Sequence, residues 1–320
     1  MQRKTKICLI AAALLVVVGV ALFAAVMQTN GWDFTKLSTG KFQLNNYEIS
    51  QEFRSVSIRT DTADITFVLS PDGKCKVECY EDVNAKHSVT VNENTLSVQL
   101  VDHRQWYDYI GIHLNTPRVI VYLPESEYTE LFVQGSTGDV QIPRDFTCNN
   151  IDISTNTGDI EVSASTTGPM ILKTRTGDIT LENMSAGTMK LTILTGLITV
   201  NGAVCHGDIS IDVSTGETDL TNVVCKKIVS KGDTGDIVLN QVVAEEIISI
   251  ERSTGDVRFH GSDALGIFVE TDTGDVTGSL LTDKYFVVET DTGSVDVPKG
   301  SHGGRCGITT GTGDVKITIP

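Results

Sequence analysis

A short Thr-Gly phrase, usually followed by Asp, returns at a nearly constant spacing through most of the chain. Its ten copies begin at Thr137, Thr157, Thr176, Thr195, Thr215, Thr234, Thr254, Thr273, Thr292 and Thr312. Successive threonines are 19 or 20 residues apart. A period this steady indicates a repeat architecture, in which similar supersecondary units stack on one another.

Each copy is predicted to form strand, bend and strand. Apolar residues alternate with polar ones before the bend, as at Ile151 and Ile153, and again after it, as at Ile179 and Leu181. This is the pattern of a strand with one buried face, and glycine supplies the backbone angles of a tight bend. A single unit cannot bury its apolar face alone. With coils about 4.8 Å apart, the pattern predicts an all-β protein, a β-solenoid of about ten coils that is about 45 to 50 Å long.

The first 30 residues differ from the rest of the chain. Arg3, Lys4 and Lys6 precede an uncharged apolar run from Ile7 to Met27. At about 1.5 Å per residue, such a helix crosses a hydrocarbon core of about 30 Å. Basic residues before the run place the N-terminus in the cytoplasm. We therefore expect a single-pass protein of the cell membrane with an extracytoplasmic C-terminal domain. A cleaved secretory signal is the alternative.

The remaining chain divides by pattern into three parts. We predict a linker over 31–52, an N-terminal β cap region over 53–130, and β-solenoid repeats over 131–320, after the cytoplasmic tip and transmembrane anchor of 1–30. Within the cap region, residues 59–65 read Arg-Thr-Asp-Thr-Ala-Asp-Ile. This is a degenerate copy of the repeat phrase with Ala63 in place of glycine. Terminal repeats are often atypical because they cap the core.

The charge of the chain limits its partners. Its 25 basic and 41 acidic residues give a net charge of −16, and removing the three basic residues of the first 30 leaves −19 for the remainder. So acidic a surface argues against nucleic acid as a partner. The expected partners are the cell membrane, through the N-terminal helix, and an envelope protein or polysaccharide.

These features together resemble a known bacterial family. The N-terminal anchor, the Thr-Asp-Thr-Ala-Asp-Ile copy at 60–65, the strand ending in Leu123-Pro124 and the Thr-Gly-Asp copies are similar to the putative-adhesin proteins of β-strand repeats. That family includes envelope-stress proteins of the Lia type. The resemblance covers the chain from about Phe53 onward. It implies a cell-surface solenoid of undetermined activity, and it carries over no catalytic residues.

No motif in the sequence points to catalysis or to a cofactor. The six histidines do not follow metalloprotease or zinc-finger spacing, and there is no nucleophile elbow, phosphate loop or dinucleotide fingerprint. The prediction is therefore a protein that is not an enzyme, with no cofactor. The alternative is a carbohydrate-active β-helix enzyme that acts on an envelope polysaccharide. Converging carboxylates in a cleft would favour that alternative.

The aspartates at the bends allow two interpretations. Oxygen-rich bends can bind calcium in stacked repeats, and the densest candidate ligands are Asp272, Asp275 and Asp291, with Glu270 and Glu289 nearby. The other interpretation is that each Asp accepts backbone N–H groups within its own bend. We favour the second, because the repeats lack the glycine-rich nonapeptide of calcium-binding solenoids.

Two further clusters attract attention. Trp106, Tyr107 and Tyr109 gather rings in a chain of which only 6% is aromatic. They are predicted either to plug the N-terminal end of the core or to contact a partner, since rings concentrate binding energy at interfaces.

Cys205 and Cys225 occupy equivalent places in neighbouring coils, where other coils carry alanine. We expect buried thiols there rather than a disulfide.

Overall fold

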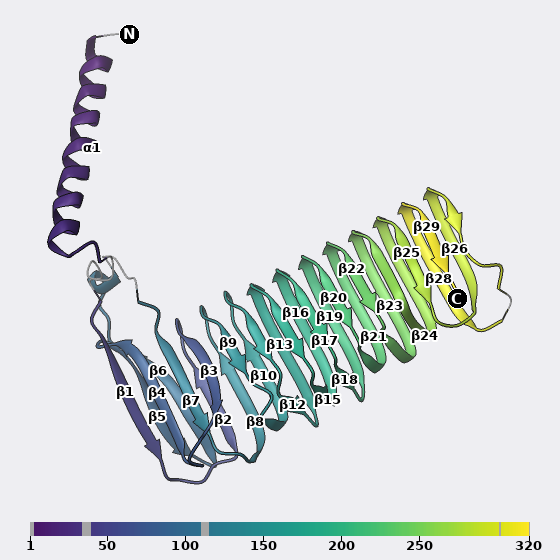
Figure 1. Cartoon of the computed structure of the whole chain (residues 1–320), viewed down its shortest axis with the longest axis horizontal. Coiled ribbons are helices and arrows are strands. Elements are labelled where there is room, and N and C mark those ends of the chain that lie inside the picture. The colour runs from purple at the N-terminus through teal and green to yellow at the C-terminus, as the bar shows by residue number, and fades with distance from the viewer. Residues whose placement is uncertain (1–2, 34–39, 110–114, 301, 320) are drawn as a thin grey trace.

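The computed structural model describes residues 3–33, 40–109, 115–300 and 302–319, and it contains one helix followed by a long stack of strands (Figure 1). Helix α1 (Arg3–Thr29) stands apart from the stack. Its segment Cys8–Thr29 contains an 18-residue window with a mean hydropathy of 3.0 and is long and apolar enough to cross a membrane. The stack itself is a β-solenoid of about nine turns, which confirms the predicted fold class.

The coils have two broad faces, which we name face A and face B. Face A consists of β1 (Phe42–Ile49), β3 (Asp64–Leu69), β4 (Cys75–Asp82), β7 (Arg118–Leu123), β9 (Val140–Ile142), β11 (Ile160–Val162), β14 (Ile179–Glu182), β17 (Ile198–Asn201), β20 (Thr218–Thr221), β22 (Ile237–Asn240), β25 (Val276–Leu280), β27 (Val295–Asp296) and β29 (Val315–Thr318).

Face B is longer and includes the short strands at the second corner of each coil. Its strands are β2 (Ser55–Arg59), β5 (Ala85–Asn92), β6 (Thr95–Asp102), β8 (Glu127–Gln134), β10 (Thr147–Ser154), β12 (Ser165–Thr166), β13 (Pro169–Thr176), β15 (Ser185–Ala186), β16 (Thr188–Thr195), β18 (Val204–Cys205), β19 (Asp208–Thr215), β21 (Val224–Thr234), β23 (Val243–Thr254), β26 (Lys284–Thr292) and β28 (Gly304–Thr312). Strand β24 (Val257–Thr273) runs through both faces.

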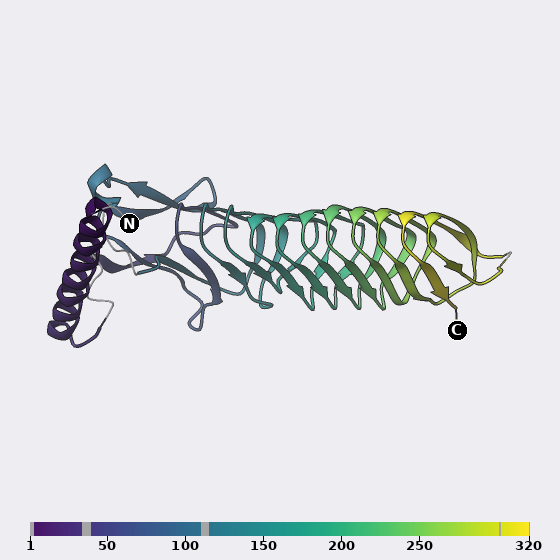
Figure 2. The same ribbon diagram turned by 90° about the horizontal axis from the view of Figure 1, so that it is seen from above.

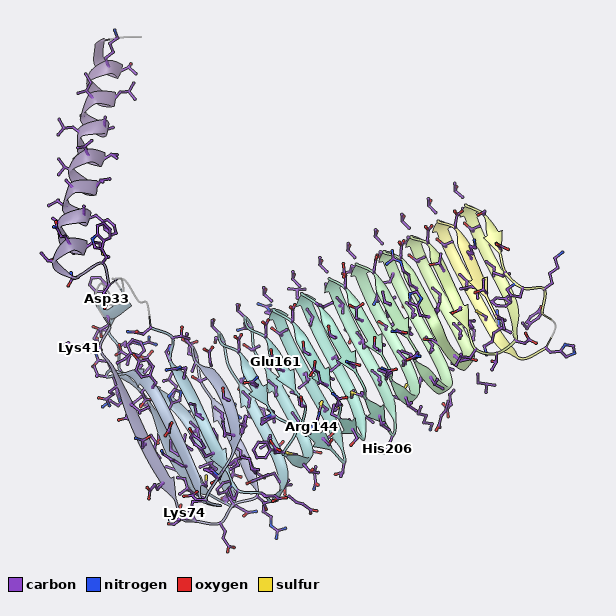
Figure 3. All side chains as sticks on the ribbon, in the orientation of Figure 1. Asp33, Lys41, Lys74, Arg144, Glu161 and His206 are labelled. Carbon is purple, nitrogen blue, oxygen red and sulfur yellow. The ribbon has the colours of Figure 1, made fainter. Side chains whose placement is uncertain are left out.

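Equivalent residues of successive coils lie in register, as the period predicts. Thr176 pairs with Thr195, Thr195 with Thr215, and Thr215 with Thr234. The degenerate copy belongs to the same row, because Thr62 forms a parallel bridge to Thr137. Side chains alternate along the strands, so that residues such as Leu172 are buried in the narrow interior seen in Figure 2. Residues of the other phase, such as Glu161, point outward (Figure 3).

The order of coils in space differs from their order in sequence at both ends. Strand β28 pairs in parallel with β24 on one side and β26 on the other, although β26 precedes it in the chain. Strand β29 likewise lies between β25 and β27. At the other end, β2 lies between β6 and β8, and β3 between β7 and β9. The antiparallel strands β1 and β5 then complete the N-terminal end of the two faces.

The aspartates of the bends hold neighbouring coils together. The backbone N–H of Asp159 donates to Oδ1 of Asp139 at 2.9 Å, and that of Asp178 donates to Oδ1 of Asp159 at 2.8 Å. The same bond recurs from Asp275 to Asp256 and from Asp314 to Asp275. The prediction that each Asp serves its own bend was therefore wrong about the partner. Stacking places each carboxylate beside the N–H group of the next coil, so the bonds run along the solenoid.

The ladder of aspartates explains why one bend carries a serine. Ser294 donates its backbone N–H to Oδ1 of Asp314 at 2.7 Å. Because the coil of β26 and β27 is the last one in the stack, no further N–H group needs an acceptor from residue 294. Aspartate is thus dispensable at this position.

One buried hydroxyl interrupts the apolar interior. Thr218 is fully buried, lies in register between Ile198 and Ile237, and its Oγ1 has no hydrogen-bond partner among the described residues. Thr218→Val should therefore raise the free energy of unfolding by about 1 to 2 kcal/mol, since it removes an unpaired buried hydroxyl at nearly constant volume. Denaturant unfolding of the purified chain measures this. The control is Thr199→Val, which changes a half-buried, outward-facing threonine; equal effects of the two changes would contradict the prediction.

Candidate functional site

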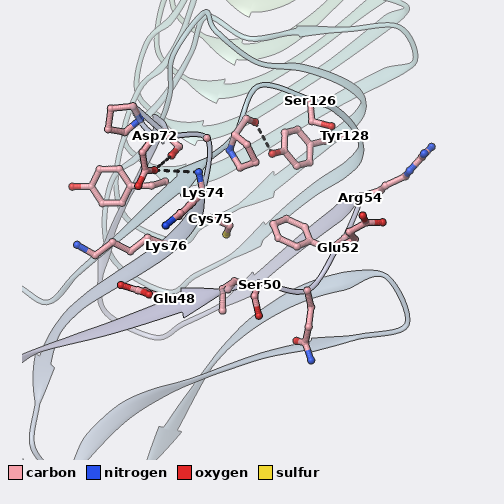
Figure 4. Close-up of a pocket in the computed structure, with 18 of the residues that line it drawn as sticks. Glu48, Ser50, Glu52, Arg54, Asp72, Lys74, Cys75, Lys76, Ser126 and Tyr128 are labelled. Atoms are coloured by element: carbon pink, nitrogen blue, oxygen red, sulfur yellow. Dashed lines mark hydrogen bonds between the residues drawn. The ribbon is translucent and has the colours of Figure 1, made fainter.

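A hollow lies at a corner of the N-terminal region, where segments distant in sequence meet (Figure 4). Its volume is about 910 Å³. The walls come from residues 48–54 after β1, the turn 70–76 between β3 and β4, and residues 122–128 before and within β8. Regular coils have a short strand at this corner, whereas here the chain turns back from β3 into β4, which pairs antiparallel on the same face.

Aromatic rings form the floor of this cleft. The rings of Phe53 and Tyr128 have centroids 6.3 Å apart, and Tyr128 packs edge-on against Phe146 at 6.4 Å. Tyr128 is buried and donates its hydroxyl to the carbonyl of Pro124 at 2.8 Å. Burial raises the pKa of the Tyr128 phenol. Ring faces of this kind suit the apolar faces of sugars or side chains.

Charged side chains of both signs surround the mouth of the cleft. Arg54 and Lys74 supply positive charge, and Glu48, Glu52 and Asp72 supply negative charge, all on exposed residues. Oδ1 of Asp72 accepts bonds from the Ser70 hydroxyl at 2.9 Å and from the Lys74 N–H at 3.1 Å. These bonds lower the pKa of Asp72, which is opposite to the shift that a general acid needs.

The thiol in the cleft is also unsuited to attack a substrate. Cys75 is buried in the wall, and burial raises the pKa of its thiol to about 12. A catalytic cysteine requires the thiolate, which forms when the pKa is lowered. The pKa values of Cys75 and Asp72 are thus both shifted away from the direction that covalent or acid catalysis by these groups requires.

A second polar cluster is buried between β4 and β5. Possible ligand atoms of Cys79, Glu81 and His87 all lie within 4.8 Å of one another. Oε2 of Glu81 accepts the backbone N–H of His87 at 2.7 Å and contacts its Nδ1 at 2.7 Å. Oε1 of Glu81 accepts a hydrogen bond from Nδ2 of Asn45 at 2.5 Å, and Nε2 of His87 lies 3.0 Å from the Thr60 hydroxyl oxygen.

These three residue types could hold a metal ion, but the cluster is already satisfied by protein groups. Burial and the nearby Glu81 raise the pKa of the Cys79 thiol to about 12, so the thiol keeps its proton. The arrangement instead ties strands β1, β4 and β5 together. Sequence reasoning missed it, although Glu81 follows Cys75, Val77 and Cys79 on the inward phase of an alternating strand. That phase was a usable signal for a buried carboxylate.

The predicted aromatic cluster has one residue whose side chain is described. Trp106 begins the 3₁₀ turn η2 (Trp106–Tyr109) between β6 and β7 and is 76% exposed. The side chains of Tyr107 and Tyr109 lie outside the described residues. The prediction that Trp106 plugs the core was therefore wrong. The end of the core is instead covered by β1 and β5, where the Tyr47 hydroxyl donates to the His87 carbonyl at 3.0 Å.

The predicted calcium ligands are spread along the edge of the stack. We call the coil of β28 and β29 the inserted coil, because β28 lies between β24 and β26. Gly311 of this coil lies in register between Asp272 and Asp291, so these two aspartates are two coils apart. Oδ1 of Asp275 accepts the backbone N–H of Asp314 at 2.8 Å. The structure does not bring Asp272, Asp275 and Asp291 together in one site.

The cysteines of the coils are buried thiols, as expected. Cys205 and Cys225 are both free and buried. Cys205 pairs in register with Ala186, and Cys225 with Ala244. The row therefore has room only for small side chains.

Comparisons with known proteins bear on this architecture. A family model described as Toastrack DUF4097 matches residues 53–210 and 204–320. The chain is similar to the crystal structure of a putative adhesin from Parabacteroides distasonis, with a TM-score of 0.50 and 12% identity over 88% of this chain and 98% of that one. No curated protein matches the chain.

Two other solved structures are similar at lower scores. A putative lipid binding protein from Parabacteroides distasonis has a TM-score of 0.47 and 15% identity, over 75% of this chain and 95% of that one. A putative adhesin from Bacteroides fragilis has a TM-score of 0.40 and 14% identity, over 88% of this chain and 99% of that one. At these identities the likeness concerns the fold.

Proposed function

Because the chain belongs to the Toastrack DUF4097 family, we propose that it is a non-enzymatic, adhesin-like binding module that α1 anchors in the cell membrane. The cleft of about 910 Å³ is the observation that carries this proposal. It combines an aromatic floor with a rim of mixed charge, and a large cleft with a few polar groups is the usual form of a ligand site.

The ligand that fits this lining is a polar chain with apolar faces. The half-buried Phe53 ring offers stacking surface, while Arg54 and Lys74 can bind carboxylates and Glu48 and Glu52 can bind amines or hydroxyls. An envelope polysaccharide or an extended protein segment has this chemistry. The names of the similar adhesin structures agree with such a role. A role in envelope stress rests on the resemblance of the repeats to Lia-type proteins.

Binding through the cleft is tested with charge reversal at its rim. The full chain in detergent is incubated with envelope extracts, and the captured material is compared between the natural chain and the Arg54→Glu, Lys74→Glu variant. Both residues are exposed, so the melting temperature should stay the same while capture falls at least tenfold. The control reverses Lys190, an exposed residue of the coils far from the cleft in sequence and register. Undiminished capture by the rim variant would exclude the cleft as the binding site.

The exposed Trp106 is proposed as a second contact. Trp106→Ala should leave the unfolding free energy within about 0.5 kcal/mol of the natural value, because most of the ring already lies in solvent. Loss of a contacting Trp should cost the complex at least about 1 to 2 kcal/mol, which is roughly a tenfold or greater loss of affinity. Leu194→Ala, at an exposed apolar residue of the coils, is the control. If capture is unchanged, the partner does not contact Trp106.

The orientation in the membrane is proposed from the basic residues before α1. Protease added to cells with permeable walls should remove the chain from about residue 30 onward and leave a stub of the size of α1. Complete protection of the solenoid would reverse the orientation. An N-terminal sequence that begins after Met27 in the membrane-free protein would instead indicate a cleaved signal.

A further inference from the structure

A buried ion pair joins two strands near the C-terminal end of the stack. Nζ of Lys284, at the start of β26, lies 2.5 Å from Oδ1 of Asp263 in β24. The side chains of Lys284 and Asp263 are only 3% and 10% exposed. This differs from the pair of Lys231 with Glu251 on the coils, in which the side chains are 58% and 57% exposed.

The two oxygens of the Asp263 carboxylate have different surroundings. Oδ1 accepts the backbone N–H of Ala264 at 2.8 Å and contacts Nζ of Lys284. Oδ2 is buried and has no hydrogen-bond partner among the described residues. Lys284 also donates from Nζ to the Thr282 hydroxyl at 2.6 Å. Oδ1 is therefore hydrogen-bonded to a backbone amide that polarises it, whereas Oδ2 has no hydrogen bond among the described residues.

This geometry is poor for a lasting ion pair. A buried charge pair is stable only when further hydrogen bonds satisfy its remaining lone pairs, and an unpaired buried carboxylate oxygen leaves much of the desolvation penalty uncompensated. Transfer of one proton from Nζ to the carboxylate removes both charges at once. The pair then consists of an amine and a carboxylic acid, whose nitrogen and carbonyl carbon are on the order of 3 Å apart, the separation of a near-attack conformer.

We propose that Lys284 and Asp263 condense to form an intramolecular isopeptide bond. The lone pair of Nζ attacks Cγ of Asp263, and the developing negative charge on Oδ1 is stabilised by the Ala264 N–H. The bond from Cγ to Oδ2 breaks, and Oδ2 leaves as water with two protons that began on Nζ. An ammonium and a carboxylate thus become a neutral amide and one water, with no oxidant, reductant or other reactant.

The surroundings provide an exit for this water. A hollow of about 630 Å³, lined by apolar residues that include Leu265 and Leu281, borders the pair. The bond would also join β24 to β26, and β28 lies between these two strands. It would therefore fix the inserted coil in its place.

Mass spectrometry of the full chain tests the proposal. No lysine or arginine lies between residues 263 and 284, so tryptic digestion should yield a looped peptide of residues 259–299 that weighs 18 Da less than its sequence. Trypsin should not cleave after Lys284 in this peptide, because an acylated lysine is not a substrate. Lys231 and Glu251, paired at 2.6 Å on the exposed surface, serve as the internal control and should be recovered unlinked.

A variant separates the bond from an accidental adduct. Lys284→Arg keeps the positive charge but cannot form the amide, so its intact mass should match its sequence while the natural chain is 18 Da lighter than its own sequence. If the natural, folded chain instead yields the unmodified tryptic peptide 259–284, cleaved after Lys284, the pair is only an ion pair and the proposal is wrong. The measurement on the natural chain does not depend on whether the variant folds.

Discussion

Gly216→Ala is expected to disrupt the stack at its centre, with a loss of about 3 to 5 kcal/mol in the free energy of unfolding or failure to fold. A Cβ atom on residue 216 would lie 1.7 Å from the carbonyl oxygen of Gly196 in the preceding coil. The φ angle of Gly216 is 145°, which side-chain-bearing residues rarely adopt. Neither backbone can move away, because each is hydrogen-bonded to the coils on both sides.

The matched control for this change is Gly135→Ala. A Cβ atom there would have no neighbour closer than 3.7 Å, and residue 135 has an ordinary φ angle. Its unfolding free energy should change by less than about 1 kcal/mol. Denaturant unfolding of both variants provides the comparison. A Gly216→Ala variant as stable as Gly135→Ala would mean that the bends are not in the close contact described.

The second large effect is expected at the buried carboxylate of the N-terminal region. Glu81→Ala removes the acceptor of three donors, the His87 N–H, the His87 ring and the Asn45 amide. Since these donors remain buried, the loss should be about 3 to 5 kcal/mol. Glu78→Ala, three residues earlier on the outward phase of β4, removes a partly exposed pair with Lys76 and a long, 3.4 Å bond from the Tyr122 hydroxyl, and should cost about 1 kcal/mol or less.

Acid should destabilise the natural chain partly through this same group. Burial acts to raise the pKa of Glu81, but the bonds from His87 and Asn45 outweigh it and hold the pKa below the usual 4.5. A group with a lowered pKa in the folded state contributes stability above its unfolded pKa. That stability is lost as pH falls through the lower, folded value. The free energy of unfolding should therefore fall less between pH 7 and pH 3 for Glu81→Ala than for the natural chain. An equal fall in the two proteins would contradict this assignment.

The regular part of the fold was predictable because it depends on local signals. The alternation around each Thr-Gly phrase defines which side chains face inward, and a period of 19 or 20 residues places Thr176, Thr195 and Thr215 in one row. Even the degenerate copy at Ala63 joins this row. The bends lie so close together that a glycine recurs wherever another bend precedes it in the stack.

The inserted coils could not be predicted in this way. The spacing from Thr273 to Thr292 and from Thr292 to Thr312 is the same as elsewhere, so the period contains no trace of the changed order. The order depends on contacts between distant residues, such as Lys284 with Asp263. It also needs glycine at residue 304, where a Cβ atom would lie 1.7 Å from the carbonyl oxygen of Leu265.

The candidate site was hidden for a similar reason. Three segments around Phe53, Lys74 and Tyr128 form the cleft, and none of them carries a motif by itself. Trp106 was found from composition alone, but its exposure depends on how β1 and β5 cover the end of the core. Sequence reasoning thus identified an unusual ring without being able to decide which way it faces.

The position of the inserted coil has a mechanical consequence for the proposed function, in which the protein binds at one point and is anchored at another. When the C-terminal coil of a solenoid is also the end coil of the stack, tension can peel it off by breaking one hydrogen bond after another. Here β28 is bonded along both edges, to β24 and to β26. Force on the C-terminal segment must therefore slide this strand lengthwise and break two ladders together. Because this force shears both ladders at once, the stack should keep its length under increasing tension and then unfold abruptly.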